Sequence, residues 1–153
     1  SKLRENFPEQ LRVTFKFFPL DASCNPLLNS QQISTSCRAA KAAYAAHQKN
    51  LFEPYHHLLF EHFRDHSILR ILAHAKEIGI EGKEEEQFIS IMKSEAALTH
   101  IRRDIAEAAD SGLKGTPTVF LNGFRYSDNG TNDVTTRYQS LRKEIQVLLQ
   151  LRR

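Results

Sequence analysis

The stretch from Gly115 to Gly123 reads Gly-Thr-Pro-Thr-Val-Phe-Leu-Asn-Gly, and it decides the predicted fold. Pro117 suits the first position of a strand, where one missing N–H is tolerated. Residues 119–121 are apolar without alternation, which predicts a short strand covered on both faces. Asn122 and Gly123 tolerate positive φ and are a strong hairpin signal. The sequence therefore predicts a loop, a buried strand, a tight turn and a second strand over residues 124–126.

A further strand is predicted upstream, over Leu11 to Phe18. This segment is rich in Val, Thr and Phe, which favour a pleated surface, and Pro19 ends it. The residues that follow, 21–26, combine Asp, Ser and Asn-Pro and are expected to form a loop.

Helical periodicity occupies most of the remaining chain. Ser34 or Thr35 is expected to cap an alanine-rich helix, whose small side chains suit a helix lying against a sheet. Pro54 suits the first turn of the next helix, and Ser67 is expected to cap another. The remaining helices are expected over residues 2–7, 84–111 and 134–151.

Composition limits the classes of protein to consider. The chain has 153 residues, of which 41% are hydrophobic and 25% are charged. These values fit one globular domain that is large enough to bury a hydrophobic core. It contains no apolar run of 18 residues, so the sequence predicts no membrane span in this segment. The net charge of +3 is spread along the chain, and we expect no nucleic-acid partner.

The segment around Thr116 and Pro117 resembles the cis-proline segment of thioredoxin-fold proteins, in particular the DsbA-like disulfide oxidoreductases. Residues 13–21 are similar to that family's second strand and the loop leaving it, and the helical block between the two segments resembles its inserted helical domain. The resemblance implies an α/β fold, with a thioredoxin-like mixed sheet and the first strand absent from this chain. It implies a single DsbA-like domain over 1–153, with residues 1–29 and 112–153 as the thioredoxin-fold core and 30–111 as the helical insertion.

One departure from the family concerns its chemistry. The family's Cys-x-x-Cys lies at the start of the first helix, after the first strand, and this chain contains neither. Residues 1–7 resemble the tail of that helix. We therefore expect an N-terminally truncated domain, whose catalytic cysteine pair lies upstream of Ser1, so that no catalytic residue is assigned within this chain.

The absent strand has a physical cost. In the thioredoxin-like order it lies between the strand at 13–17 and the strand at 119–121, and pairs with both. Buried backbone groups left without partners cost roughly 1–3 kcal/mol each, and several of them would approach the whole stability of a domain, about 5–15 kcal/mol. We expect another strand to fill the gap, supplied by missing residues rather than by a partner chain or a rearranged pairing.

Cys24 and Cys37 stand thirteen positions apart and do not form a Cys-x-x-Cys. Three interpretations stay open: a structural disulfide, two unrelated buried thiols, or a reactive pair. A disulfide that closes a loop of this size contributes about 3 kcal/mol to the stability of the fold in the chain-entropy model. Structural disulfides are typical of extracytoplasmic proteins. The reactive interpretation rests on the position of Cys37 near a helix N-terminus, which lowers a thiol pKa.

Four of the seven histidines, His56, His57, His62 and His66, crowd one predicted helix. The last two share a face at i, i+4 spacing, as in zinc peptidases, but the segment lacks the Glu of His-Glu-x-x-His and a third ligand. We expect surface or packing histidines and no metal site.

The resemblance implies a thiol-disulfide oxidoreductase without a cofactor, periplasmic or otherwise extracytoplasmic in a bacterium. Its partners would be protein thiols or an extended peptide, with a membrane redox protein as a further candidate. Thr116 and Pro117 would hold the substrate strand, whereas in the alternative interpretation Thr116 only shapes its loop. Two other functions stay open: a non-catalytic thioredoxin-fold module that binds peptides or a partner, and a helical metal-binding or sensor protein.

Overall fold

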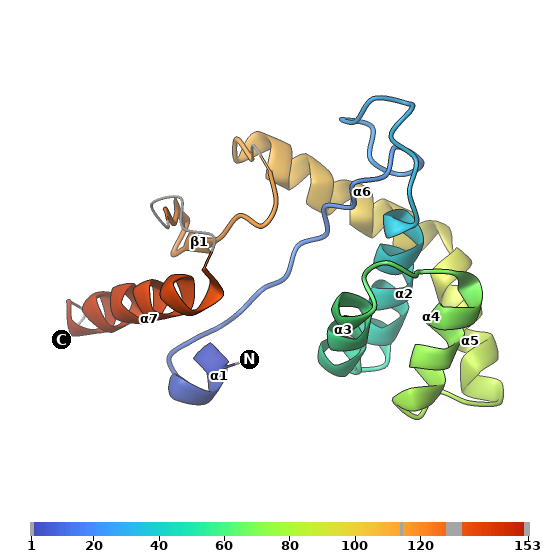
Figure 1. The fold of residues 1–153 in the computed structure, drawn as a ribbon, viewed down its shortest axis with the longest axis horizontal. Coiled ribbons are helices and arrows are strands. Elements are labelled where there is room, and N and C mark those ends of the chain that lie inside the picture. Colours follow the sequence, from blue (N-terminus) through green and yellow to red (C-terminus); the bar gives the residue numbers. More distant parts are fainter. Residues whose placement is uncertain (1, 114, 128–132, 152–153) are drawn as a thin grey trace. The chain divides into compact units, whose positions relative to one another are not determined.

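The structure, a computed structural model, describes residues 2–113, 115–127 and 133–151. The chain divides into two compact units, whose elements are drawn in Figure 1. Lys16–Gly112 forms the helical unit, and the described parts of Ser1–Phe15 and Leu113–Arg153 form the hairpin unit. The predicted division at residues 29 and 112 stays a prediction.

Helix α2, Ser36–Gln48, is the centre of the helical unit. It contacts α3 (Phe52–Glu61), α4 (Ile68–Glu77), α5 (Lys83–Lys93) and α6 (Glu95–Asp110). Ala42, Ala45 and Ala46 are fully buried, and their small side chains let four helices approach one axis. The prediction that this helix lies against a sheet was wrong, because its apolar faces are covered by helices.

Larger side chains from the surrounding helices complete this core. The largest fully buried ones are Tyr55 and Phe88, whose ring centroids lie 5.6 Å apart in an edge-to-face arrangement. The Tyr55 hydroxyl donates a 3.0 Å hydrogen bond to the carbonyl of Ile71, so its polar tip has a partner inside the core. The same cluster includes Leu59, Ile80 and Met92.

The helix predicted over 84–111 is two helices, separated at Ser94. Ser94 has extended backbone angles (φ −70°, ψ 153°), and its hydroxyl accepts a hydrogen bond from the Ala97 N–H at 3.2 Å. The same hydroxyl donates to the Ile91 carbonyl at 2.7 Å. The Ser94 side chain thus caps the end of α5 and the start of α6. The apolar residues keep a helical spacing across Ser94, so the sequence pattern did not show this break.

The predicted strand over 11–18 is not a strand, because residues 11–19 have no regular secondary structure. The two-stranded sheet of the described residues does not include this segment. Instead, the Phe17 N–H donates to Oδ2 of Asp104 on α6 at 3.1 Å, and Nζ of Lys16 contacts Oδ1 of the same carboxylate at 3.1 Å. A buried carboxylate on a helix therefore takes the place of a sheet partner for this part of the chain.

The hairpin unit contains α1 (Lys2–Asn6), β1 (Phe120–Leu121), β2 (Phe124–Arg125) and α7 (Val134–Gln150). The two strands are antiparallel, with Phe120 opposite Arg125. Asn122 and Gly123 have φ values of 49° and 86°, which confirms the predicted turn. Asn6 Nδ2 donates to the Tyr138 hydroxyl at 2.9 Å and links α1 to α7.

The predicted burial of both faces of the first hairpin strand was wrong. Val119 is 37% exposed and Phe120 39%, and Phe124 on the second strand is 80% exposed. The sheet of the described residues consists of these two short strands, which leaves their apolar side chains partly uncovered. The mixed sheet stays a prediction.

Candidate functional site

The loop before β1 carries the two predicted substrate-binding residues. The Thr116–Pro117 peptide bond is cis, and both residues are exposed. The Thr118 hydroxyl donates to the Gly115 carbonyl at 2.6 Å and closes the loop. No hydrogen bond joins Thr116 to another described residue. The loop therefore presents polar backbone and a rigid ring to the solvent.

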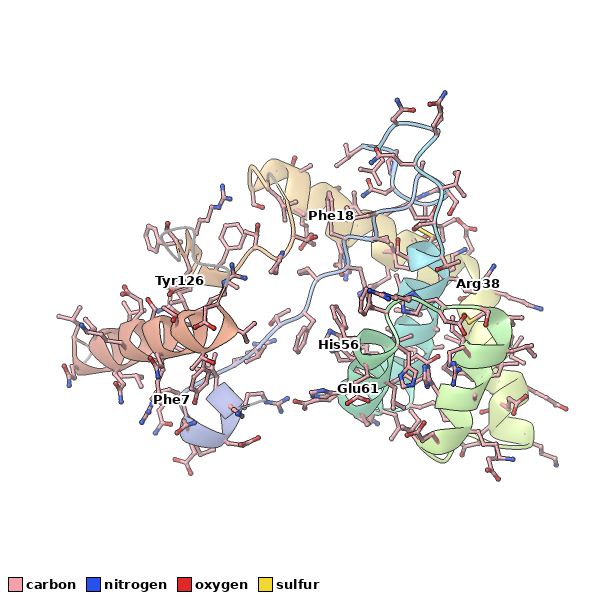
Figure 2. The ribbon with its side chains drawn as sticks, viewed as in Figure 1. Phe7, Phe18, Arg38, His56, Glu61 and Tyr126 are labelled. Atoms are coloured by element: carbon pink, nitrogen blue, oxygen red, sulfur yellow. A yellow bond between two sulfur atoms is a disulfide. The ribbon has the colours of Figure 1, made fainter. Side chains whose placement is uncertain are left out.

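A cavity of about 380 Å³ lies beside the hairpin, but neither Thr116 nor Pro117 lines it. Its walls come from β1, β2 and α7 and include Phe124, Tyr126 and Glu144. The Tyr126 hydroxyl is buried, with no hydrogen-bond partner among the described residues. Figure 2 labels Tyr126 at the end of the hairpin.

The two cysteines belong to the helical unit and are joined to each other. A disulfide links Cys24 to Cys37, with their Cα atoms 6.0 Å apart, and Figure 2 draws it in yellow. Cys24 is 2% exposed and Cys37 6%, and both pack with Ile101 and Ile105 of α6. The structure thus contains a bonded pair, and the choice between a structural and a reactive role stays open.

Asp21, which sequence reasoning assigned only to a loop, connects both cysteines. Its carbonyl accepts from the Cys24 N–H at 3.2 Å, and Oδ2 of its carboxylate accepts from the Cys37 N–H at 3.2 Å. The other carboxylate oxygen accepts from the Ser23 N–H at 3.0 Å. The residue is 1% exposed. Burial alone would raise the pKa of this carboxyl, but the hydrogen bonds from Ser23, Cys37 and Ser34 outweigh it and hold the pKa below its ordinary value.

The histidines do not form the predicted helical pair. Helix α3 ends at Glu61, so His62 lies at its C-cap and His66 in the following loop, where its Nε2 lies 3.1 Å from the Leu59 carbonyl. The i, i+4 prediction was wrong because the helix stops first. His56 packs between the rings of Phe52 and Phe60, with centroids 5.3 and 4.6 Å away. Among the described residues, no three His, Cys, Asp or Glu side chains are placed to hold a metal ion.

His74 is the histidine that sequence reasoning missed. It is 1% exposed, its ring centroid lies 4.8 Å from that of His62, and its Nε2 is buried with no partner among the described residues. Burial, and then the nearby His62, Arg70 and His66, lower its pKa below the ordinary value of 6.5, while Glu77 acts in the opposite direction. The neutral ring is therefore favoured in the folded state.

We expect the stability of the helical unit to fall as pH is lowered below about 6.5. Below that pH, His74 becomes protonated in the unfolded chain while it stays neutral in the folded one. The contribution of His74 to the free energy of unfolding is therefore fully present above about pH 6.5 and is lost as the pH falls towards the folded-state pKa. Urea unfolding at pH 7.5 and 5.5 measures the effect. A His74→Gln variant should show a smaller difference between the two pH values, and a His57→Gln variant, changed at an exposed position, should keep most of the difference, since His57 only contributes to lowering the pKa of His56. An equal pH dependence in all three proteins would contradict this assignment.

The model of the DSBA-like thioredoxin domain family matches residues 2–146, nearly the whole chain. The chain belongs to the DSBA-like thioredoxin domain family. Membership supports an α/β thioredoxin fold. No solved structure matches the chain.

A relative with a different description shares part of this domain. The chain is 34% identical over 100 residues to a protein named Na(+)/H(+) antiporter NhaA from Herminiimonas arsenicoxydans. The match covers 64% of this chain and 15% of the antiporter. Because the family match extends over residues 2–146, the shared region lies almost wholly within the DSBA-like domain. No helix among the described residues is long and apolar enough to cross a membrane.

Proposed function

We propose that this chain is part of a thiol-disulfide oxidoreductase acting on protein thiols and disulfides, with a Cys-x-x-Cys on residues that precede Ser1 in the full protein. The family match over residues 2–146 carries the proposal. In the reaction a cysteine thiolate attacks a disulfide and forms a mixed disulfide, which a second thiolate then resolves. Cys24 and Cys37 do not act as this pair, because their spacing is wrong and both are nearly covered.

We assign the holding of the substrate chain to Thr116 and Pro117. Their exposure supports the assignment, as does the absence of a hydrogen bond from Thr116 to another described residue. An extended peptide can then form main-chain hydrogen bonds at this loop, as peptides do at open strand edges. In the full protein, a Thr116→Pro substitution, which removes the N–H, would test the role through KM for a peptide disulfide.

Residues 1–153 alone are expected to show little insulin reduction in the presence of a dithiol, because the catalytic pair is absent. The full protein should reduce insulin, and replacing its upstream cysteines should remove that activity. Turbidity of precipitating insulin B chain measures both. Robust turnover by residues 1–153 that disappears in a Cys37→Ser variant would overturn the assignment.

A second candidate function is a thioredoxin-fold module that binds peptides or a partner without redox catalysis. It is favoured by one observation: the two cysteines that the chain has are bonded to each other and buried. The sequence preceding Ser1 separates the two functions. A Cys-x-x-Cys about ten residues upstream supports the oxidoreductase, and a complete gene without it supports the binding module.

We place the domain outside the cytoplasm of a bacterium, in association with a membrane protein. DSBA-like proteins are typically extracytoplasmic, and a relative that shares this region is named as an antiporter. Alkaline phosphatase fused to the C-terminus of the full protein would be active in this location and inactive in the cytoplasm.

A further inference from the structure

The Cys24–Cys37 disulfide borders a cavity of about 380 Å³ in the helical unit. Cys37 is one of the residues that line it, and Cys24 is not among them. Met92, 6% exposed, contributes an apolar wall, and Ser23 and Ser34 contribute hydroxyl-bearing side chains. Cys37 therefore borders a space large enough for a small molecule, while Cys24 is enclosed.

The charged side chains of this cavity are mostly cationic. Arg38, Lys41 and Lys93 line it, against the single carboxylate of Asp21. The Asp21 oxygens already accept hydrogen bonds from the Ser23 and Cys37 backbone. Figure 2 labels Arg38 on α2, where its Nη1 donates to the His66 carbonyl at 3.1 Å. Three cations beside one engaged carboxylate favour an anionic molecule in this space.

We propose that this cavity is a second thiol-disulfide exchange site, separate from the Cys-x-x-Cys chemistry, which admits an anionic low-molecular-weight thiol and exchanges it at Cys37. The proposal rests on the disulfide, the cavity on the Cys37 side and the three cations. It does not depend on the function proposed above.

The exchange takes place in two balanced steps. The incoming thiolate attacks Sγ of Cys37, a bond forms between the two sulfurs, and the Cys24–Cys37 bond breaks. Cys24 leaves as a thiolate and takes up a proton. A second molecule of the thiol then attacks the mixed disulfide, which releases the oxidised dimer of the small thiol and leaves both cysteines reduced. Two electrons pass from two small thiols to one protein disulfide.

The same geometry favours a small thiol over a protein thiol at this site. Both cysteines are at most 6% exposed, so a thiol held on a folded protein surface reaches them less readily than a small thiol does. Asp21 accepts hydrogen bonds from the backbone N–H groups of both cysteines, and these hydrogen bonds do not involve the sulfur atoms. After reduction the two thiols therefore remain close together, and the oxidised dimer of the small thiol can re-form their disulfide by the reverse of the two steps.

The test uses residues 1–153 with three small thiols: reduced glutathione as the anionic probe, 2-mercaptoethanol as the neutral one and cysteamine as the cationic one. Acid quenching and mass spectrometry of peptides locate the mixed disulfide. Glutathione is expected on Cys37, at a rate per thiolate at least tenfold above that of cysteamine at low salt. The difference should shrink in 0.5 M NaCl, since salt screens exposed charges.

Charge variants identify the cavity as the site. The Lys41→Gln and Lys93→Gln substitutions should each slow glutathione about threefold and leave 2-mercaptoethanol unchanged. Lys83→Gln, which removes a charge at the start of α5 outside the cavity lining, serves as the matched control and should change neither rate. Circular dichroism establishes that each variant is folded.

Three outcomes would overturn the proposal. They are a disulfide that resists millimolar glutathione in the folded protein, a mixed disulfide on Cys24, and equal rates per thiolate for the three probes. Because the assay reads small-thiol exchange and not insulin reduction, its failure leaves the function proposed above unaffected, and an inactive full protein leaves this site unaffected.

Discussion

Replacing Phe88 by alanine should destabilise the helical unit by about 3–5 kcal/mol, the usual cost of removing a buried phenyl ring. Phe88 is fully buried and packs edge-to-face on Tyr55, at the junction of α3 and α5 with α2. The loss combines the transfer free energy of the ring with the cavity left behind, because a core built on alanines has few large side chains that could fill the space. Urea unfolding followed by far-UV circular dichroism measures the change.

The matched control for this variant is Phe63→Ala. Phe63 follows α3 in the turn and is 64% exposed, so its removal should change stability by no more than about 0.5 kcal/mol. If the two substitutions had similar effects, the helical unit would not have the core described here.

Replacing Asp104 by alanine should cost about 2–3 kcal/mol. Asp104 is fully buried on α6, and its carboxylate accepts from the Phe17 N–H and from Nζ of Lys16, both at 3.1 Å. Hydrogen bonds to a charged group contribute about 1.5–3 kcal/mol, and a buried donor left without a partner adds a penalty. The Lys16 contribution is small, because that side chain is 44% exposed.

The Glu107→Ala variant shows how much of the Asp104→Ala effect comes from burial of the carboxylate, because both carboxylates contact Lys16. Glu107 lies one turn further along α6 and approaches Nζ of Lys16 more closely, at 2.7 Å, yet it is 52% exposed. Exposed ion pairs contribute little to stability because solvent screens them, so this variant should lose much less stability than Asp104→Ala. A larger loss for Glu107→Ala than for Asp104→Ala would show that the Lys16 ion pair, and not the hydrogen bond to Phe17, anchors residues 16 and 17.

Local signals in the sequence were sufficient for much of the fold. Ser67 caps α4 as predicted, with its hydroxyl accepting from the Arg70 N–H at 3.3 Å, and Asn122-Gly123 forms the predicted turn. Helix α7 begins and ends within one residue of its expected bounds. Each of these features depends on neighbours within four residues, which is the range over which side-chain chemistry can be read directly from a sequence.

The failures concern interactions between distant residues. Residues 11–18 have strand composition, but a strand requires a partner, and here the backbone of Phe17 bonds to a helix 87 positions away. Asp21 appeared to be an ordinary loop acid, because its role depends on Cys37, sixteen positions further along the chain. Burial of His74 was also missed, although the helical spacing indicates it, because His74 lies three residues after the buried Ile71 and next to the buried Ala75.

The alanines of α2 have a consequence for how this domain tolerates change. Ala42, Ala45 and Ala46 have no exposed surface, and the helix that carries them contacts four others. An added methyl group at such a position cannot be absorbed by one neighbour alone, so it displaces several helices together. Sequence variation along this axis is therefore expected to be concerted, with any enlargement in α2 matched by a smaller residue on the facing helix.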